Sequence, residues 1–386
     1  MKKTVLSLIT ISTLSTVGAI ASSSEIEELK AQMALMSAKI EKLEKQDSVK
    51  LNQKFEEATV VESKAPILQF SGTHYLGFVS SDDKGEKFES RRNYLQVKGY
   101  FDEESKSYFR ITLDTHQIDD SFYQDEDGNS YGKDTYGTWN VRLKYAYLYL
   151  DDILPFTGVE IGQAHRPWID YEEHGGWNYR SISKVLVEES NAGDLTNSAD
   201  LGINFKTKTD YFSSELGVFN GEGYHGIEDG DGMSAEWRLT AHLLGGGTHK
   251  HKSKNIYADI SFFGQLNEKS NKHKNEDLDW YGIHAVYNQP EFLVALQYVA
   301  TENANVNYAG EGYSINGEYR FMENWNIIGR YDNWEMDEDA LTKERSIAGV
   351  AYKYNKNVEF IANYLGTDIS DNYSDNAIML TAEINW

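Results

Sequence analysis

The chain has 386 residues, a formal net charge of -24 and no cysteine. The negative charge argues against a nucleic-acid-binding protein, which needs a basic surface, and the absence of cysteine excludes disulfides and thiolate metal sites. Aromatic residues make up 13% of the chain and prolines number only 4, a combination that favours a barrel with uninterrupted strands and aromatic rims over a soluble domain.

The N-terminus has the pattern of a secretory leader. Lys2 and Lys3 precede the apolar stretch 5–20, and Ala19 and Ala21 form a small-x-small cleavage site. This order of a basic, an apolar and a small-residue region predicts a signal peptide over residues 1–21. The mature protein is therefore expected outside the cytoplasm.

The segment 22–46 carries a heptad seam. Apolar residues recur with spacings of three and four at Ile26, Leu29, Met33, Met36, Ile40 and Leu43. This spacing predicts a short coiled coil, which would form readily if a homotrimer held three copies together. The alternative is an amphipathic helix that lies on the base of the barrel. Residues 47–65 are polar without a clear period and are interpreted as a linker.

Residues 66–386 have the alternation of a transmembrane antiparallel β-barrel. In the last strand, apolar residues occupy every second position at Ile378, Leu380, Ala382, Ile384 and Trp386. Further clear strands are 94–101, 108–115, 141–150, 235–243, 256–263, 292–299, 325–332, 347–354 and 358–365. Less regular ones are 67–79, 157–163, 199–206, 211–219, 279–287 and 313–321. The total is sixteen strands, with fourteen or eighteen as alternatives, and sixteen leave an aqueous lumen.

The connections between these strands alternate in length. Long ones are expected at 80–90, 117–139, 164–198, 220–234, 267–277, 333–344 and 366–375. Short periplasmic turns and long outer loops are typical of outer-membrane barrels. A soluble all-β protein is the alternative, but it would not require this alternation.

The parity of each strand predicts which side chains face the lumen. In 141–150, Val141, Leu143 and Tyr145 are expected to face lipid, so Arg142 and Lys144 face inward. A charge on the lipid face costs roughly 2–4 kcal/mol near the midplane, which favours the inward assignment. The predicted wall residues are Arg92, Lys98, Arg110, Arg142, Lys144, Arg238, Arg320 and Arg330.

The connection 164–198 is long and rich in aromatic and charged residues. If it folds into the barrel, its charges lie opposite the wall cations and narrow the pore. The predicted constriction residues are Arg166, Asp170, Glu172, Glu173, Arg180 and Lys184. The alternative is an outer loop in solvent. His249 and His251 in the THKHK segment have the chemistry to contact a metal, but a solvated loop is the expectation for them as well.

At this loop the sequence resembles a known family. The run VEIGQAHRPWIDYEEHGGWNYRS over 159–181, followed by SADLGINF and GVFNGEGYHG, is similar to the porins related to phosphate-selective porin O/P. The resemblance implies a trimeric sixteen-stranded channel with a loop folded inward. Phosphate selectivity is not carried over, because acidic residues outnumber basic ones here, 61 to 37.

These observations predict a homotrimeric porin in the outer membrane of a Gram-negative bacterium, surrounded by lipid and lipopolysaccharide. Small hydrophilic solutes and ions would diffuse through it, without catalysis, cofactor, metal or nucleic acid. Two alternatives stay open. One is a channel selective for anions such as phosphate, or for oligosaccharides. The other is an adhesin or enzyme built on a plugged barrel.

Overall fold

The computed structural model describes residues 27, 30–32, 34–36, 38–39, 42, 67–83, 85–101, 106–117, 139–226, 232–269, 276–337, 341–370 and 373–386. The chain divides into two compact units, Met1–Ala65 and Pro66–Trp386. In the first unit the described residues are helical, and Met36 is the one seam residue among them. The signal peptide, the linker and the rest of the seam lie outside the described residues, so these segments stay predictions.

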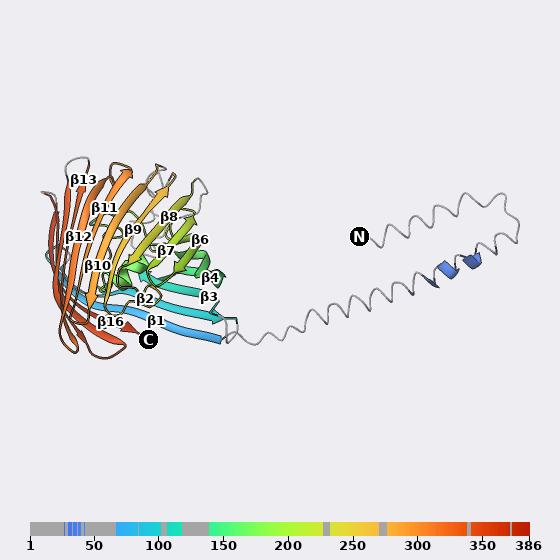
Figure 1. The fold of residues 1–386 in the computed structure, drawn as a ribbon, viewed down its shortest axis with the longest axis horizontal. Coiled ribbons are helices and arrows are strands. Elements are labelled where there is room, and N and C mark those ends of the chain that lie inside the picture. Colours follow the sequence, from blue (N-terminus) through green and yellow to red (C-terminus); the bar gives the residue numbers. More distant parts are fainter. Residues whose placement is uncertain are drawn as a thin grey trace. The chain divides into compact units, whose positions relative to one another are not determined.

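The second unit is a closed barrel of sixteen antiparallel strands, as the sequence predicts (Figure 1). Each strand pairs with the next along the chain, and β1 pairs with β16 to close the ring. The strands are β1 (Ile67–Ser81), β2 (Gly85–Tyr100), β3 (Tyr108–Gln117), β4 (Trp139–Leu154), β5 (Thr157–His165), β6 (Ala199–Lys208), β7 (Phe212–Phe219), β8 (Ser234–His242), β9 (Tyr257–Asn267), β10 (Asp279–Gln289), β11 (Phe292–Asn303), β12 (Gly310–Met322), β13 (Trp325–Met336), β14 (Thr342–Lys353), β15 (Val358–Ile369) and β16 (Tyr373–Asn385).

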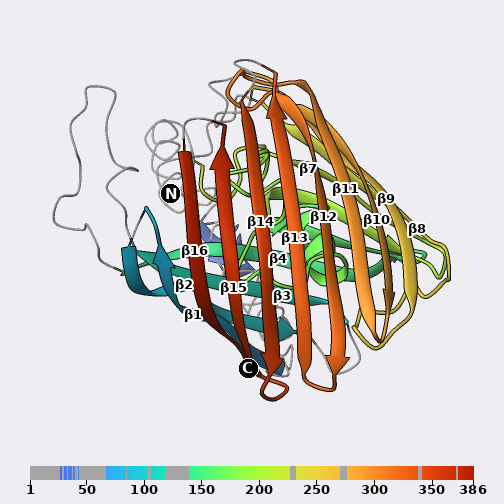
Figure 2. The ribbon, with the colours of Figure 1, turned by 90° about the vertical axis from the view of Figure 1, so that its left-hand side faces the viewer.

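Alternation along each strand separates an apolar outer face from the interior. Figure 2 shows β8 to β16 side by side in this wall. On β16, Ile378 and Leu380 are exposed on the outer face, as predicted, whereas Met379 and Thr381 are buried. No described helix is long and apolar enough to span a membrane.

The two ends of the barrel differ in their connections. Turns such as 290–291 and 323–324 lie at the end that holds Ile67 and Trp386, which we call the short-turn end. The expected long loop at 80–90 is wrong, because β1 and β2 continue pairing as far as Ser81 and Gly85. Conversely, the connection 243–256 between β8 and β9 is long although it lies at the short-turn end.

Two of the register shifts in the wall are β-bulges that change the facing of cationic side chains. In β2, Tyr75 pairs with Arg92 and Leu76 pairs with Ser90, so Arg91 is the extra residue. In β4, Lys144 is skipped in the same way between the pairs of Thr112 and Leu113. A bulge reverses the parity of the residues beyond it.

The bulge in β4 corrects one sequence-based expectation. Tyr145 does not face lipid: its side chain is 6% exposed, and its hydroxyl donates a 3.4 Å hydrogen bond to the carbonyl of Ser198. Its ring also contacts the ring of His165, 4.3 Å between centroids. Parity counted from Val141 and Leu143 fails here because the extra residue lies between Leu143 and Tyr145.

The connection 166–198 lies inside the barrel. It contains the short helix α3 (Ile169–Gly175), which appears within the ring of strands in Figures 1 and 2. Its apolar residues form one buried cluster with the inner faces of β9 to β11 and β13 to β15. The loop contributes Trp168, Ile169, Trp177, Tyr179, Ile182, Val185, Leu186, Val187, Ala192 and Leu195, and the wall contributes Phe263, Trp280, Val299, Ile328, Trp334, Ile347, Ala351 and Ile361. The loop therefore fills one side of the lumen.

Candidate functional site: a narrowed and charged lumen

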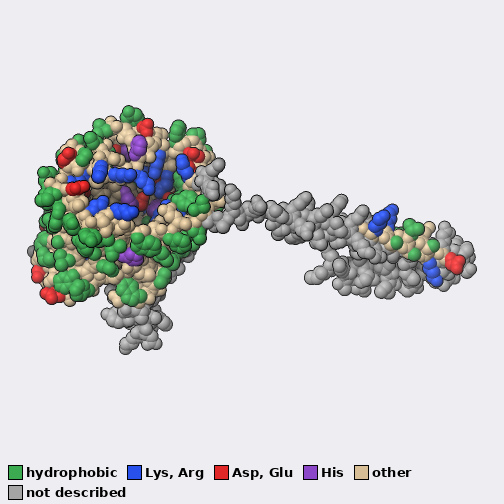
Figure 3. Space-filling view, turned by 90° about the horizontal axis from the view of Figure 1, so that it is seen from below, with side chains coloured by type: hydrophobic (Ala, Val, Ile, Leu, Met, Phe, Trp, Pro, Cys, Tyr) green, Lys and Arg blue, Asp and Glu red, His purple; other side chains and the backbone are tan. Residues whose placement is uncertain are grey.

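A cavity of about 2380 Å³ occupies the side of the lumen that the loop leaves open. It is lined by β1 to β5, by one face of the loop around α3, and by the tip of the connection 243–256. Figure 3 looks into the barrel from below the view of Figure 1 and shows Lys and Arg side chains around the hollow. The cavity is therefore polar, charged and open at this mouth.

Four cations line the wall of the cavity formed by β2, β3 and β4. They are Arg92, Lys98, Arg110 and Lys144. Within the described part of the chain, none of the four forms an ion pair with a carboxylate. Aromatic rings lie close to all four, and Arg110 also donates hydrogen bonds to Thr112 Oγ1, at 3.0 Å, and to the Tyr147 hydroxyl, at 3.2 Å. Lys98 lies 4.4 Å from the ring centroid of Tyr108, and the guanidinium of Arg110 lies 4.6 Å from that of Tyr145. This wall therefore carries positive charge that no described carboxylate neutralises.

Tyrosines surround these cations. Those that line the cavity along β1 to β4 are Tyr75, Tyr94, Tyr100, Tyr108, Tyr145, Tyr147 and Tyr149. Neighbouring rings lie close together, for example Tyr108 and Tyr149 with centroids 5.1 Å apart. Rings stabilise nearby cations through their negative faces and also present flat apolar surface to solutes.

The opposite side of the mouth carries carboxylates. Glu359 on β15 and Glu383 on β16 line the same cavity, and so does Glu318 on β12, which is paired with Arg320 at 2.7 Å. The sign of the charge changes across β1, because Tyr75 pairs in register with Arg92 on one side and with Glu383 on the other. Such an arrangement produces a field across the lumen, which the sequence predicts for a different set of acidic residues, those of the loop.

Buried ion pairs hold the loop in place. Arg180 bonds both Glu173, at 2.7 Å, and Glu188, at 2.5 Å, while Arg166 at the start of the loop pairs with Glu236 on β8. Burial alone would raise the pKa of the Glu188 carboxyl, but the charges of Arg180 and Lys184 outweigh burial and hold this pKa below its usual range. The first two pairs cross-link the middle of the loop, and the third attaches its start to the wall.

Glu172 on α3 has the opposite environment. Its side chain is 1% exposed and accepts hydrogen bonds from Trp168 Nε1, at 2.7 Å, and Gln297 Nε2, at 2.9 Å. Burial raises the pKa of its carboxyl to about 7. The loop therefore contains one carboxyl group that titrates near neutral pH.

The predicted wall residues fall into two groups. Arg238 and Arg320 line the cavity but are paired with Glu215, at 3.1 Å, and Glu318, at 2.7 Å. Arg142 and Arg330 face inward but do not line the cavity. Arg142 pairs with Asp114, at 2.7 Å, and Arg330 pairs with Asp332, at 2.8 Å, beneath the ring of Trp177. Parity indicates the inward direction, but it does not indicate which part of the wall the loop covers.

The predicted constriction residues divide in the same way. Asp170, Glu173 and Arg180 line the cavity, whereas Arg166, Glu172 and Lys184 do not. Arg166 and Glu172 are buried because they attach the loop to β8 and β11. Lys184 is directed toward Glu188, with 3.9 Å between Nζ and Oε1.

Sequence reasoning missed several residues at this site. The guanidinium of Arg91 donates to the carbonyl of Ser181, at 3.2 Å, and to Thr381 Oγ1, at 2.7 Å, so it joins the loop to β16. The alternation of the strand predicts that Arg92 faces inward but does not predict the position of Arg91. Arg91 is the extra residue of a bulge, and no feature of the sequence indicates that bulge. The lumen tyrosines, in contrast, have a signal in the unusual total of 26 Tyr.

Comparison with known proteins supports the fold alone. No family model and no curated protein matches the chain, so the resemblance to phosphate-selective porins stays a prediction. Solved structures do match. A loop-deletion mutant of OmpT, an outer membrane protein of Vibrio cholerae, is 14% identical with a TM-score of 0.58, covering 84% of this chain and 100% of that one. A trimer form of OmpT is 13% identical, with a TM-score of 0.57 and coverages of 84% and 100%. An anion-selective porin from Comamonas acidovorans is 12% identical, with a TM-score of 0.57 and coverages of 83% and 99%.

Proposed function

We propose that this protein is a passive channel of the outer membrane that conducts small hydrophilic solutes and ions, with a preference for anions. The observation that carries the proposal is the set of four lumen cations, Arg92, Lys98, Arg110 and Lys144, without a carboxylate partner among the described residues. The apolar outer face of a closed barrel fits lipid, and porins of the same fold support the location.

The channel would act by electrostatics and by width. In a lumen with low-dielectric walls, unneutralised cations concentrate anions and repel cations. The loop 166–198 restricts the width on the opposite side, where Asp170 and Glu173 face the wall. The solute gradient is the energy source, and no residue needs to react with the solute. An adhesin or enzyme on a plugged barrel is less well supported, because an open cavity of about 2380 Å³ lies beside the loop.

The functional unit would be a homotrimer embedded among outer-membrane lipid and lipopolysaccharide. The trimer form of a protein with this fold supports this part of the proposal, and so does the predicted coiled coil of residues 22–46. By the usual orientation of such barrels, the short-turn end faces the periplasm.

Reversal potentials in planar bilayers test the proposal. Mature protein is reconstituted, and single-channel currents are recorded in a KCl gradient. We expect current steps in groups of three and a reversal potential shifted toward the equilibrium potential of chloride. If folded protein gives no current, the channel function is wrong. If the reversal potential is shifted toward the equilibrium potential of potassium, only the anion preference is wrong.

The lumen tyrosines favour a second candidate, a channel that prefers sugars or oligosaccharides. Rings that follow one another along β1 to β4 offer flat faces on which a pyranose ring can stack. This candidate predicts that neutral oligosaccharides block the KCl current in a saturable way. Unchanged current at high oligosaccharide concentration would exclude it.

A further inference from the structure

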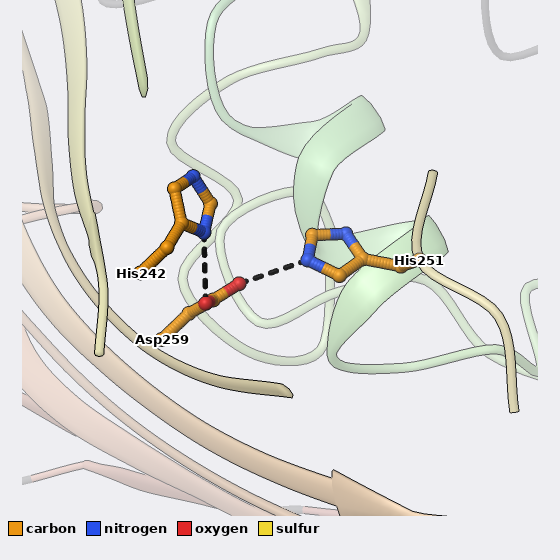
Figure 4. A group of neighbouring side chains, drawn as sticks. All are labelled: His242, His251 and Asp259. Carbon is orange, nitrogen blue, oxygen red and sulfur yellow. Dashed lines mark hydrogen bonds and ion pairs between the residues drawn. The ribbon is translucent and has the colours of Figure 1, made fainter. Parts of the chain in front are cut away.

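A cluster of metal-ligating side chains lies in the lumen, apart from the wall cations. His242 ends β8, Asp259 lies opposite it on β9, and His251 comes from the connection 243–256 between these strands (Figure 4). His242 Nδ1 lies 2.8 Å from Asp259 Oδ1, and His251 Nε2 lies 2.8 Å from Asp259 Oδ2. One ligand atom from each residue lies within 4.8 Å of the others.

From this geometry we propose that His242, His251 and Asp259 bind a divalent transition metal ion such as Zn²⁺. Two imidazoles and one carboxylate are a ligand set that suits zinc, and they leave a fourth position for water. This departs from the sequence-based expectation that the chain holds no metal and that His251 lies in a solvated loop. In the structure the side chain of His251 is only 16% exposed.

The neighbouring side chains allow a metal ion to replace the two hydrogen bonds between the imidazoles and Asp259. A ligating imidazole must offer a lone pair, so His242 would carry its proton on Nε2. That nitrogen lies 2.9 Å from Ser213 Oγ, which can accept the proton in a hydrogen bond. The hydroxyl of Tyr171 lies 2.7 Å from Asp259 Oδ2 and orients the carboxylate from α3, in the way that second-sphere partners orient metal ligands.

The position of the connection 243–256 supports the site. Its tip, GTHKHKSK over 247–254, contains no apolar side chain, and the ring of His251 packs against Tyr257, with centroids 4.4 Å apart. The tip is attached through His251 and through backbone carbonyls such as that of Ser253, which accepts from Arg320 at 3.1 Å. The glycine at position 175 leaves room for the ring of His251, because a Cβ at Gly175 would lie only 3.0 Å from Nδ1 of His251. An ion would therefore join the connection to the wall of the barrel.

The proposed metal site is accessible from the cavity and has few cations near it. His242 and His251 both line the cavity, so an ion can enter from the short-turn mouth. The neighbouring cations are Lys250 and Lys252, which are exposed, and Arg238, which is paired with Glu215.

Metal titration of the folded protein tests this proposal independently of conductance. Mature chain without a histidine tag is titrated with Zn²⁺ by calorimetry, and with Co²⁺ by visible absorption. One ion per chain and the intense visible bands of tetrahedral Co²⁺ are expected. Absence of binding, or Co²⁺ bands of an octahedral hydrated ion only, would overturn the site.

The loop offers a matched control two residues away. His251→Ala should weaken Zn²⁺ binding by at least about 100-fold. A loss of this size exceeds what removal of a second-sphere partner, which does not touch the metal, usually causes. His249→Ala should leave it unchanged, because His249 is exposed and lies outside the cluster. Asp259→Asn, checked for folding by its heat-modifiable mobility on gels, should reproduce the effect of His251→Ala. Equal losses in the His249 and His251 variants would show surface binding and overturn the proposal.

Discussion

The ammonium of Lys144 on β4 donates a 2.6 Å hydrogen bond to the phenol of Tyr94 on β2. It also lies 4.5 Å from the centroid of the same ring. The side chain is 3% exposed, and its partner is a neutral group. The amine is therefore held at the edge of the cavity by a neutral partner, without a contacting carboxylate among the described residues.

Lys144→Met should lower the anion-to-cation permeability ratio by roughly two- to fivefold. A unit charge a few Å from a permeating ion contributes about 0.5–1 kcal/mol in a water-like dielectric. Reversal potentials in a KCl gradient measure the ratio. Lys269→Met removes the same charge from an exposed site outside the cavity and is the control. Equal potentials for the two variants would contradict the placement of Lys144 at the edge of the cavity.

Arg142 provides a test of charge pairing. Its guanidinium donates to one oxygen of Asp114 through two nitrogens, at 3.0 and 2.7 Å. Arg142→Ala should reduce anion permeability, because it leaves the Asp114 carboxylate without its partner. Removing both charges with Arg142→Ala and Asp114→Ala should restore a ratio near that of the parent. If the double variant is as cation-preferring as the single one, the pair does not act as a neutral unit.

The attachment of the loop can be weakened at Trp177. This residue is 1% exposed and packs in the cluster between loop and wall. Trp177→Ala should cost about 3–5 kcal/mol of packing and should release the loop into wider positions. Larger and noisier single-channel steps are expected. Trp325→Ala, on the outer face, is the control. Steps of parental size with parental noise would show that the loop does not depend on this residue.

Glu172 should make the stability of the loop depend on pH. Its folded-state pKa is raised from 4.5 to about 7, so the folded loop retains a proton that the unfolded chain releases. Stability should fall as pH rises from 4.5 to 7, by about 3 kcal/mol in total, and should stay level above 7. Thermal unfolding followed by circular dichroism measures the trend. Glu172→Gln should flatten it, and an unchanged slope in that variant would assign the dependence to other groups.

Removal of residues 25–46 should weaken the trimer. Six apolar seam residues spaced for a coiled coil would no longer add to the contacts of three barrels. The expected result is a trimer that dissociates at lower temperature on gels. A scrambled segment of the same composition is the control, because it keeps the length but loses the seam. Trimers of parental heat resistance would remove this role from the segment.

The sequence predicts the barrel well because strand faces have a fixed period. Leu380 and Ala382 alternate with Thr381 and Glu383, and lipid outside and water inside require that alternation. The inward direction of Arg92 and Arg110 follows from the same rule. Periodicity cannot reveal an inserted residue, however, so Arg91 and Tyr145 are assigned wrongly or not at all.

The position of the loop depends on contacts far apart in the chain. Trp168 stacks on Phe263 with centroids 3.5 Å apart, and Arg166 pairs with Glu236. Neither pairing has a signal in local sequence, so Arg330 could not be recognised as lying beneath the loop. For the same reason the meeting of His242, His251 and Asp259 could not be predicted, since it depends on how the connection 243–256 turns back into the lumen.

The two bulges have a consequence for how such a channel can change over evolution. Each inserts one residue, Arg91 or Lys144, without altering the number of strands or the closure of the ring. A single-codon insertion or deletion in β2 or β4 would exchange inward and outward side chains over several positions at once. The selectivity of the channel could therefore change in one genetic step, whereas individual substitutions would need many steps to exchange the same side chains.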